Sequence, residues 1–166
     1  MRIAGKRQGF RGPKTALPPF PLRGDAATAP GMNPPSPLVA SAYVFLGGGI
    51  GAVLRHQMGR GVTHWLGVQA VTTFPWATLL VNVVGSLAMG VLAGFMARHG
   101  QGGEHWRLFL GVGVLGGFTT FSAFSLEMML LIERGQTTSA MIYALISVLA
   151  GVSALYLGLI VMRLAG

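Results

Sequence analysis

Apolar residues in this chain fall into four long runs separated by short polar stretches. The runs cover residues 38–54, 74–97, 108–132 and 139–162. Each of the last three has about 24 residues, and about 20 suffice to cross the hydrocarbon core of a bilayer. The first run is shorter and rich in glycine, so it is a weaker candidate on its own. The pattern predicts an all-α integral membrane protein with four transmembrane helices.

Charged residues are arranged as a membrane protein requires. Asp and Lys are absent from the four runs, and Glu127 is the only acidic residue inside them. The three tryptophans lie near the predicted membrane–water interfaces, which indole rings favour. The expected ends of the helices are marked by Arg55, Arg60, Arg98, Arg107, Glu133, Arg134 and Arg163.

Composition removes several functional classes. Of the 166 residues, 52% are apolar and only 10% are charged, far from the usual soluble composition. Cysteine is absent, which excludes disulfides, thiolate metal sites and cysteine nucleophiles. No nucleophile–base arrangement, phosphate-binding loop or pair of acids is present, so an enzyme is not expected. The histidines do not cluster as metal ligands and stand at positions 56, 64, 99 and 105.

The formal charge of +8 comes mostly from residues 1–37. This stretch holds six of the twelve basic residues and eight of the nine prolines. Such a composition predicts a disordered tail, and it lacks the apolar segment of a secretory signal. An alternative is that translation begins at Met32. Residues 38–166 then form the four-helix domain, and the basic character gives no reason to expect nucleic-acid binding.

The arginines of the four-helix domain favour neither membrane orientation. Four spans place Arg98, Arg107 and Arg163 on one side and three arginines on the other, at positions 55, 60 and 134. Because arginine and lysine set the direction of insertion, such a chain can insert both ways. Four short helices also leave little room for a pore within one subunit. We therefore expect an antiparallel homodimer of dual topology.

The third run contains the most informative segment, GVGVLGGFTTFSAFSLE at residues 111–127. Gly116 and Gly117 weaken a helix, and the two threonines that follow can bond backbone carbonyls. We expect the third helix to be broken at mid-membrane, where irregular backbone is tolerated only in protein or beside a polar cavity. The break would free carbonyl oxygens for a cation such as Na⁺. A kink used only for packing is the alternative.

Several side chains around this segment are candidates for an anion path. Phe121 and Phe124 lie three residues apart and hence on one helix face, and the positive edge of a phenyl ring can favour an anion. Packing alone also explains such a pair. Asn82 lies within the second run, where an amide must be hydrogen-bonded, either to another helix or in a pore. Hydroxyl donors occur within the runs at Thr78, Ser86, Ser122, Ser125, Tyr143 and Ser147.

Glu127 is a candidate because an intramembrane carboxylate is often functional. It lies about two helical turns beyond the threonine pair, so a structural pairing or capping role is equally open.

Three motifs together resemble the CrcB/Fluc family of fluoride channels. They are GGGIGAVLRHQMGR at 47–60, TLLVNVVGSLAMG at 78–90 and GVLGGFTTFSAFSLE at 113–127. The resemblance covers residue 38 to the C-terminus. It implies a dual-topology homodimer with two antiparallel pores that releases fluoride passively across the bacterial inner membrane and protects the cell.

The resemblance also implies roles for particular residues. A structural Na⁺ at the dimer interface would be held by backbone carbonyls of Gly116 and Thr119 from each subunit. The pore would be lined by Asn82, Phe121 and Phe124, with Ser122, Thr78 and Tyr143 as further polar groups. Arg55 matches the arginine of the first-helix motif. Ala123 departs from the family, which usually has Ser or Thr there, and the long tail is a second departure.

Two other classes of membrane protein share part of this sequence pattern. A small multidrug-type exporter also pairs four-helix subunits, but it relies on a carboxylate in its first helix, and residues 38–54 contain none. A non-transporting membrane subunit explains the apolar runs and the glycines. It does not explain Asn82, the expected break and the phenylalanine pair together.

Overall fold

The computed structural model describes residues 35–99 and 103–165, and these residues form helices joined by turns, without a β-strand among them. The predicted tail, residues 1–37, lies outside the described residues except for its last three positions. Within the described part, the helical segments long and apolar enough to cross a membrane are Pro37–Leu66, Trp76–Arg98, Glu104–Glu133 and Thr137–Leu164. The prediction of four membrane-spanning helices is confirmed in this sense.

The first helix, α1 (Pro37–Leu66), is much longer than the predicted run at 38–54. It begins behind Ser36, whose hydroxyl accepts a hydrogen bond from the Val39 N–H at 3.4 Å. It ends at Gly67, whose φ of 81° is a conformation that glycine adopts readily. The predicted end near Arg55 was wrong. Helical hydrogen bonds are made by the backbone, so the helix continues after the side chains become polar.

A short helix, α2 (Val68–Thr73), follows α1 and was not predicted. The next long helix, α3 (Trp76–His99), begins two residues later than the predicted run at 74–97. Phe74 has an extended backbone, and Pro75 has no N–H to donate, although its carbonyl accepts from the Leu79 N–H at 3.1 Å. Proline is well suited to such a position just before a helix.

The third predicted run, 108–132, consists of several pieces. They are α4 (Glu104–Trp106), the π-helix η2 (Arg107–Leu115), α5 (Gly116–Phe118) and α6 (Phe121–Glu133). In the π-helix the hydrogen bonds reach one residue further back, and the Gly116 N–H donates to the Gly111 carbonyl. Such segments are rare and often occur at functional sites.

The last helix, α7 (Thr137–Leu164), follows a tight turn and corresponds to the predicted run at 139–162. Gly135 forms the turn with a φ of 75°. The helix begins after Gln136, whose carbonyl accepts from the Ala140 N–H at 3.1 Å. The difference of two residues at each end is of the size expected when helix ends are inferred from apolar residues.

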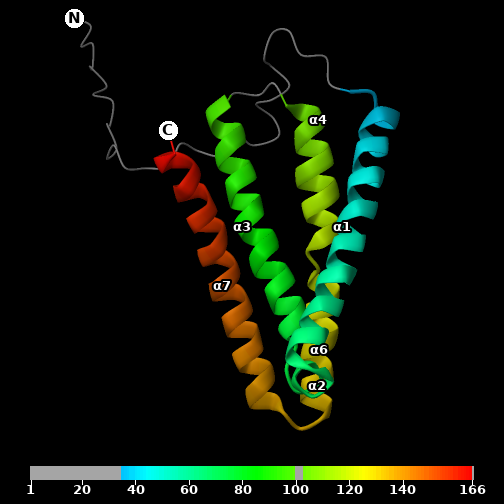
Figure 1. The fold of residues 1–166 in the computed structure, drawn as a ribbon, viewed down its shortest axis with the longest axis vertical. Coiled ribbons are helices and arrows are strands. Elements are labelled where there is room, and N and C mark those ends of the chain that lie inside the picture. Colours follow the sequence, from blue (N-terminus) through cyan, green and yellow to red (C-terminus); the bar gives the residue numbers. More distant parts are fainter. Residues whose placement is uncertain (1–34, 100–102, 166) are drawn as a thin grey trace, which may run out of the picture. The chain divides into compact units, whose positions relative to one another are not determined.

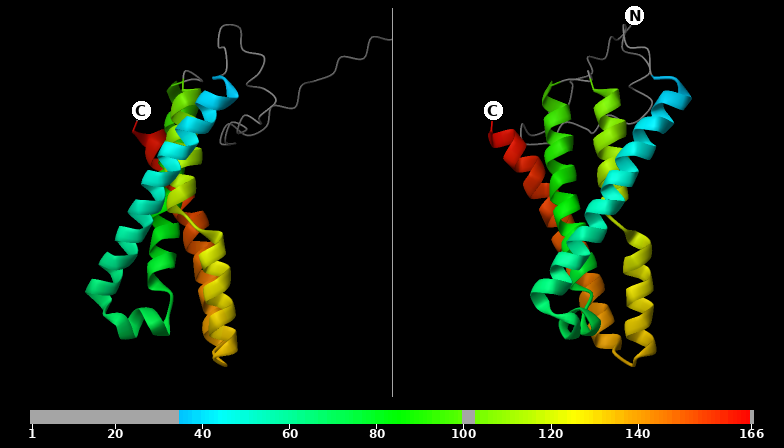
Figure 2. Two further views of the ribbon diagram at one scale, coloured as in Figure 1. Left: turned by 90° about the vertical axis from the view of Figure 1, so that its right-hand side faces the viewer. Right: turned by 45° about the vertical axis from the view of Figure 1, so that its right-hand side comes forward.

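The helices pack in two closely apposed pairs (Figures 1 and 2). One pair is α3 with α7, and the other is α1 with η2 and α5. Glycines lie at both crossings. A Cβ atom on Gly90 would meet the carbonyl oxygen of Leu155, and one on Gly51 would meet that of Val114. Small residues allow this approach in lipid, where van der Waals packing contributes much of helix association.

A cluster of buried side chains joins the α3–α7 pair to α6. Leu79 of α3, Leu131 of α6, and Ala140 and Tyr143 of α7 form its centre. Phe124, which lies near the start of α6, packs against the cluster. The cluster therefore fixes α6 against α3 and α7.

Replacing Gly90 with alanine should destabilise the fold. The added methyl group would overlap the Leu155 carbonyl, so α3 and α7 must separate, at a cost of about 1–3 kcal/mol. Thermal unfolding in detergent, followed by circular dichroism, measures the loss. Gly49→Ala is the matched control, because nothing lies within 4 Å of its new methyl group and alanine favours a helix. An equal melting temperature for the two variants would contradict the close packing.

Candidate functional site

The helical path through the third span is interrupted between α5 and α6. Thr119 has φ −77° and ψ 159°, and Thr120 has φ −151° and ψ 122°. Both residues are thus extended rather than helical. The Thr119 hydroxyl donates to the Leu115 carbonyl at 2.9 Å, and the Thr120 hydroxyl accepts from the Ala123 N–H at 3.3 Å. Each threonine side chain therefore completes the end of one helix.

Asn82 holds the interrupted segment from the neighbouring helix α3. Its side-chain amide nitrogen donates to the Thr120 carbonyl at 3.1 Å, and its oxygen accepts from the Thr120 N–H at 2.9 Å. One asparagine therefore pairs with both backbone groups of one residue. Of the two roles considered from the sequence, the structure places Asn82 as a hydrogen-bonded link between helices. The second N–H of its amide is not needed for these two bonds.

These bonds also release two backbone carbonyls. In a continuous α-helix the Thr120 N–H would donate to the Gly116 carbonyl and the Ala123 N–H to the Thr119 carbonyl. Here the first donates to Asn82 and the second to the Thr120 hydroxyl. The Gly116 and Thr119 oxygens have therefore lost their helical donors. They are the two carbonyls that the resemblance assigned to a cation.

Glu127 of α6 accepts hydrogen bonds from two other helices. The Thr78 hydroxyl of α3 donates to one carboxylate oxygen at 2.7 Å, and the Tyr143 hydroxyl of α7 donates to the other at 2.8 Å. Each hydroxyl has one hydrogen, so neither can donate to an anion while it is bound to Glu127. The carboxylate thus connects α3, α6 and α7 through two buried hydroxyl groups.

The phenylalanine pair stands beside this network at the start of α6. The ring centroids of Phe121 and Phe124 lie 5.7 Å apart with the planes tilted by 36°. Phe124 also packs on the buried Tyr143 ring at 5.0 Å. Phe121 is 79% exposed. Ser122 completes the group, with its hydroxyl oxygen 3.3 Å from that of Thr120.

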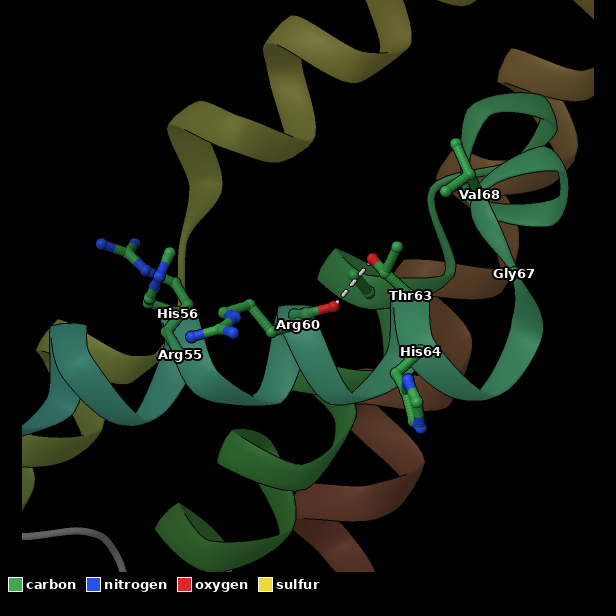
Figure 3. A pocket seen from close by; sticks show the side chains of 9 residues that line it. Arg55, His56, Arg60, Thr63, His64, Gly67 and Val68 are labelled. Atoms are coloured by element: carbon green, nitrogen blue, oxygen red, sulfur yellow. Dashed lines mark hydrogen bonds between the residues drawn. The ribbon is translucent and has the colours of Figure 1, made fainter.

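Two hollows are lined in part by α1, and the smaller one reaches the interrupted segment. The larger, of about 720 Å³, is lined by residues of α1 that include Arg55, His56 and Arg60 (Figure 3). The smaller, of about 130 Å³, shares Arg55 with it and reaches Thr78, Thr120 and Ala123. Arg55 therefore borders both hollows. Ala123 contributes no hydroxyl to this wall.

The structure brings together most of the residues that the sequence identified. Asn82 is hydrogen-bonded to Thr120. Glu127 accepts hydrogen bonds from Thr78 and Tyr143. By contrast, Phe121 and Ser122 lie on the exposed side of α6. Sequence reasoning missed His56 and Arg60 as wall residues, because it took them to lie beyond the first helix. Their spacing of four residues on a helix would have placed them on one face.

No group of three or more His, Asp or Glu side chains is arranged to hold a metal ion among residues 35–99 and 103–165. Backbone oxygens are suitable ligands for hard cations.

Tyr143→Phe should lower stability by about 1–2 kcal/mol, because one carboxyl oxygen of Glu127 would lose its hydroxyl donor. Thermal unfolding measures this loss, and a double-mutant cycle with Glu127→Gln identifies its origin. In the Glu127→Gln background the effect of Tyr143→Phe should fall by at least half. An undiminished effect there would mean that the tyrosine hydroxyl acts through another group.

The fold and the site define a protein with four helices apolar enough to cross a membrane, in which an interrupted helix, hydroxyl groups and a pair of phenylalanine rings lie together. Residues 42–159 match the family model described as CrcB-like protein, Camphor Resistance (CrcB). The chain belongs to the CrcB family.

The match to curated relatives covers nearly the whole length of each relative. A fluoride-specific ion channel FluC of Novosphingobium aromaticivorans is 62% identical over 126 residues, covering 76% of this chain and 98% of the relative. A fluoride-specific ion channel FluC of Erythrobacter litoralis is 54% identical over 134 residues, covering 80% and 98%. One of Rhodospirillum centenum is 53% identical over 122 residues, covering 74% and 94%. With its four apolar helices, this chain is a multi-pass bacterial membrane protein.

Proposed function

We propose that this chain is a fluoride-selective ion channel that lets fluoride leave the cell passively across the inner membrane. The observation that carries the proposal is the Thr119–Thr120 interruption with Asn82 bonded to both backbone groups of Thr120. An asparagine and an irregular backbone are costly in lipid, so a protein that only needs packed helices has little reason to contain them. The relatives named as fluoride-specific ion channels point to the same function.

The pore groups are the second N–H of Asn82, the Ser122 hydroxyl, and the edges of Phe121 and Phe124. A small anion is strongly hydrated, and it can exchange water for N–H and O–H donors. The positive ring edges stabilise it without a hydrogen bond. Thr78 and Tyr143 support the pore without donating to the anion, because their hydroxyls donate to Glu127. Glu127 then fixes three helices, and the anion does not need to contact it.

A Na⁺ ion would fit the carbonyl oxygens of Gly116 and Thr119. Their helical donors are bonded to Asn82 and to the Thr120 hydroxyl, so both oxygens are open to a ligand. The ion would supply fixed positive charge and satisfy backbone that would otherwise be unpaired at mid-membrane. Its role is structural. Two carbonyls are too few for one Na⁺, which is one reason to expect a second subunit.

The functional unit is proposed to be an antiparallel homodimer of dual topology. Phe121 is 79% exposed and Gly116 is also exposed, so both groups are available to a second copy. The even division of arginines permits the opposite insertion that this symmetry needs. In an antiparallel dimer, each interrupted helix would meet its symmetry mate near mid-membrane.

Passive release suits the chemistry of fluoride. In acid surroundings the ion enters as neutral HF and ionises inside the cell, where it is trapped. An inside-negative potential contributes about 2.3 kcal/mol per charge per 100 mV toward anion exit. A channel needs no further energy source. Passive conduction also involves no catalytic residue.

Fluoride efflux from proteoliposomes tests the function. Purified protein is reconstituted, and release is followed with a fluoride electrode, with chloride release measured in parallel. Rapid release of fluoride with little chloride is expected. If well-folded protein releases neither ion, the channel function is wrong and a non-transporting membrane subunit becomes the best explanation.

A further inference from the structure

The larger hollow is lined on one side by arginine and histidine side chains of α1. Figure 3 shows Arg55, His56 and Arg60 gathered at one end and His64 at the other. Its remaining lining residues are small or apolar apart from Thr63, whose hydroxyl donates to the Gly59 carbonyl at 2.9 Å. No acidic side chain is among the residues that line it. The hollow therefore concentrates positive charge without a built-in counter-ion.

The arginines of this hollow differ from most others in the described part of the chain. Arg107 pairs with Glu104, Arg98 donates to the Met162 carbonyl at 3.3 Å, and Arg134 donates to the Thr72 carbonyl at 2.9 Å. Arg55 and Arg60 have no such acceptor among residues 35–99 and 103–165. Two guanidinium groups beside a histidine repel one another. An anion that enters the hollow would relieve that repulsion.

The donors of the hollow suit an anion larger than fluoride. A guanidinium presents paired N–H groups that match two oxygens of one phosphate, and a monatomic ion cannot use that fork. Arg55, His56 and Arg60 together offer more donors than one fluoride can accept. The donor set therefore favours a tetrahedral oxyanion.

We propose that the hollow lined by Arg55, His56 and Arg60 is a binding site for a phosphate group. The group can come from free phosphate or from the headgroup of an anionic phospholipid. Trp65 and Leu66, at the end of α1, are 89% and 52% exposed and would suit the acyl chains of a lipid. The site goes beyond the proposed function. If that function holds, a bound phosphate would compete with fluoride beside Arg55, which also borders the smaller hollow.

The first arm of the test uses inorganic phosphate and the purified full chain. Isothermal titration calorimetry compares the wild type with Arg60→Gln, and chloride is the control anion. Binding should weaken at least tenfold in Arg60→Gln. Arg60→Lys keeps the charge but lacks the fork, and it should bind phosphate with intermediate affinity. Arg163→Gln is the matched control, since Arg163 is exposed and does not line the hollow.

The second arm uses nanodiscs containing equal parts of phosphatidylglycerol and phosphatidylcholine, with retained lipids counted by native mass spectrometry. Preferential retention of phosphatidylglycerol, lost in Arg60→Gln but kept in Arg163→Gln, assigns the site to a lipid headgroup. Phosphate binding without this preference assigns it to the free ion. Absence of both, or equal losses in the two glutamine variants, overturns the site. Neither arm measures fluoride flux, so a failure here leaves the channel proposal untouched.

Discussion

Replacing Phe121 and Phe124 together with isoleucine should slow fluoride release at least a hundredfold while the protein stays folded. Isoleucine keeps apolar bulk at both positions, so the packing on Tyr143 is largely retained. It has no ring quadrupole, and the positive edges that would stabilise a desolvated anion are lost. If each ring lowers the barrier by about 1.4 kcal/mol, the two together account for about a hundredfold in rate. Fluoride efflux from proteoliposomes measures the change.

A matched pair of substitutions on the same helix distinguishes this effect from general damage. Leu126 and Met129 are also three residues apart and are 61% and 53% exposed. Leu126→Ile/Met129→Ile should therefore release fluoride as the wild type does. Chloride release should stay low in both double variants. Comparable loss of efflux in the two pairs would indicate that α6 tolerates no change, and the phenyl rings would then have no specific role.

The number of spanning helices could be predicted from the sequence because the membrane imposes a simple requirement. Each span needs a run of apolar residues, and such runs are visible without any knowledge of packing. The end of α1 could not be predicted in this way. Its last turns carry Arg60, His64 and other polar groups, and only the conformation of Gly67 shows where the helix stops.

The residues of the candidate site could be predicted from the sequence, but their hydrogen-bond partners could be predicted only in part. A lone Asn82 and a lone Glu127 in apolar runs each require hydrogen-bond partners. The sequence does not say which partners they find, because the partners are far away along the chain. The Asn82–Thr120 bond spans 38 positions, and the Thr78–Glu127 bond spans 49. The π-helix at Arg107–Leu115 was not predicted either; within it, Gly113 lies close to Gly47 of α1.

Asn82→Leu should abolish fluoride release, and we expect the loss to come through the backbone of Thr120. Leucine has nearly the same size as asparagine but offers no hydrogen bond. The N–H and the carbonyl of Thr120 would both lose their partner, at a cost of about 2–6 kcal/mol if they stayed unpaired. The chain can avoid that cost by returning the Thr120 N–H to the Gly116 carbonyl as in a continuous helix. That closure removes an oxygen proposed to hold Na⁺ and moves the phenylalanine pair.

Thermal unfolding and fluoride efflux, measured on the same preparations, separate the two consequences. Asn82→Asp keeps the acceptor for the Thr120 N–H but loses the donor and adds negative charge. We therefore expect it to preserve more stability than Asn82→Leu while fluoride release is still lost. Gln69→Leu is the control, because it makes a similar change at an exposed position of α2. Wild-type efflux in Asn82→Leu would show that the interrupted helix does not depend on this asparagine. The proposed pore would then have to be sought elsewhere in the fold.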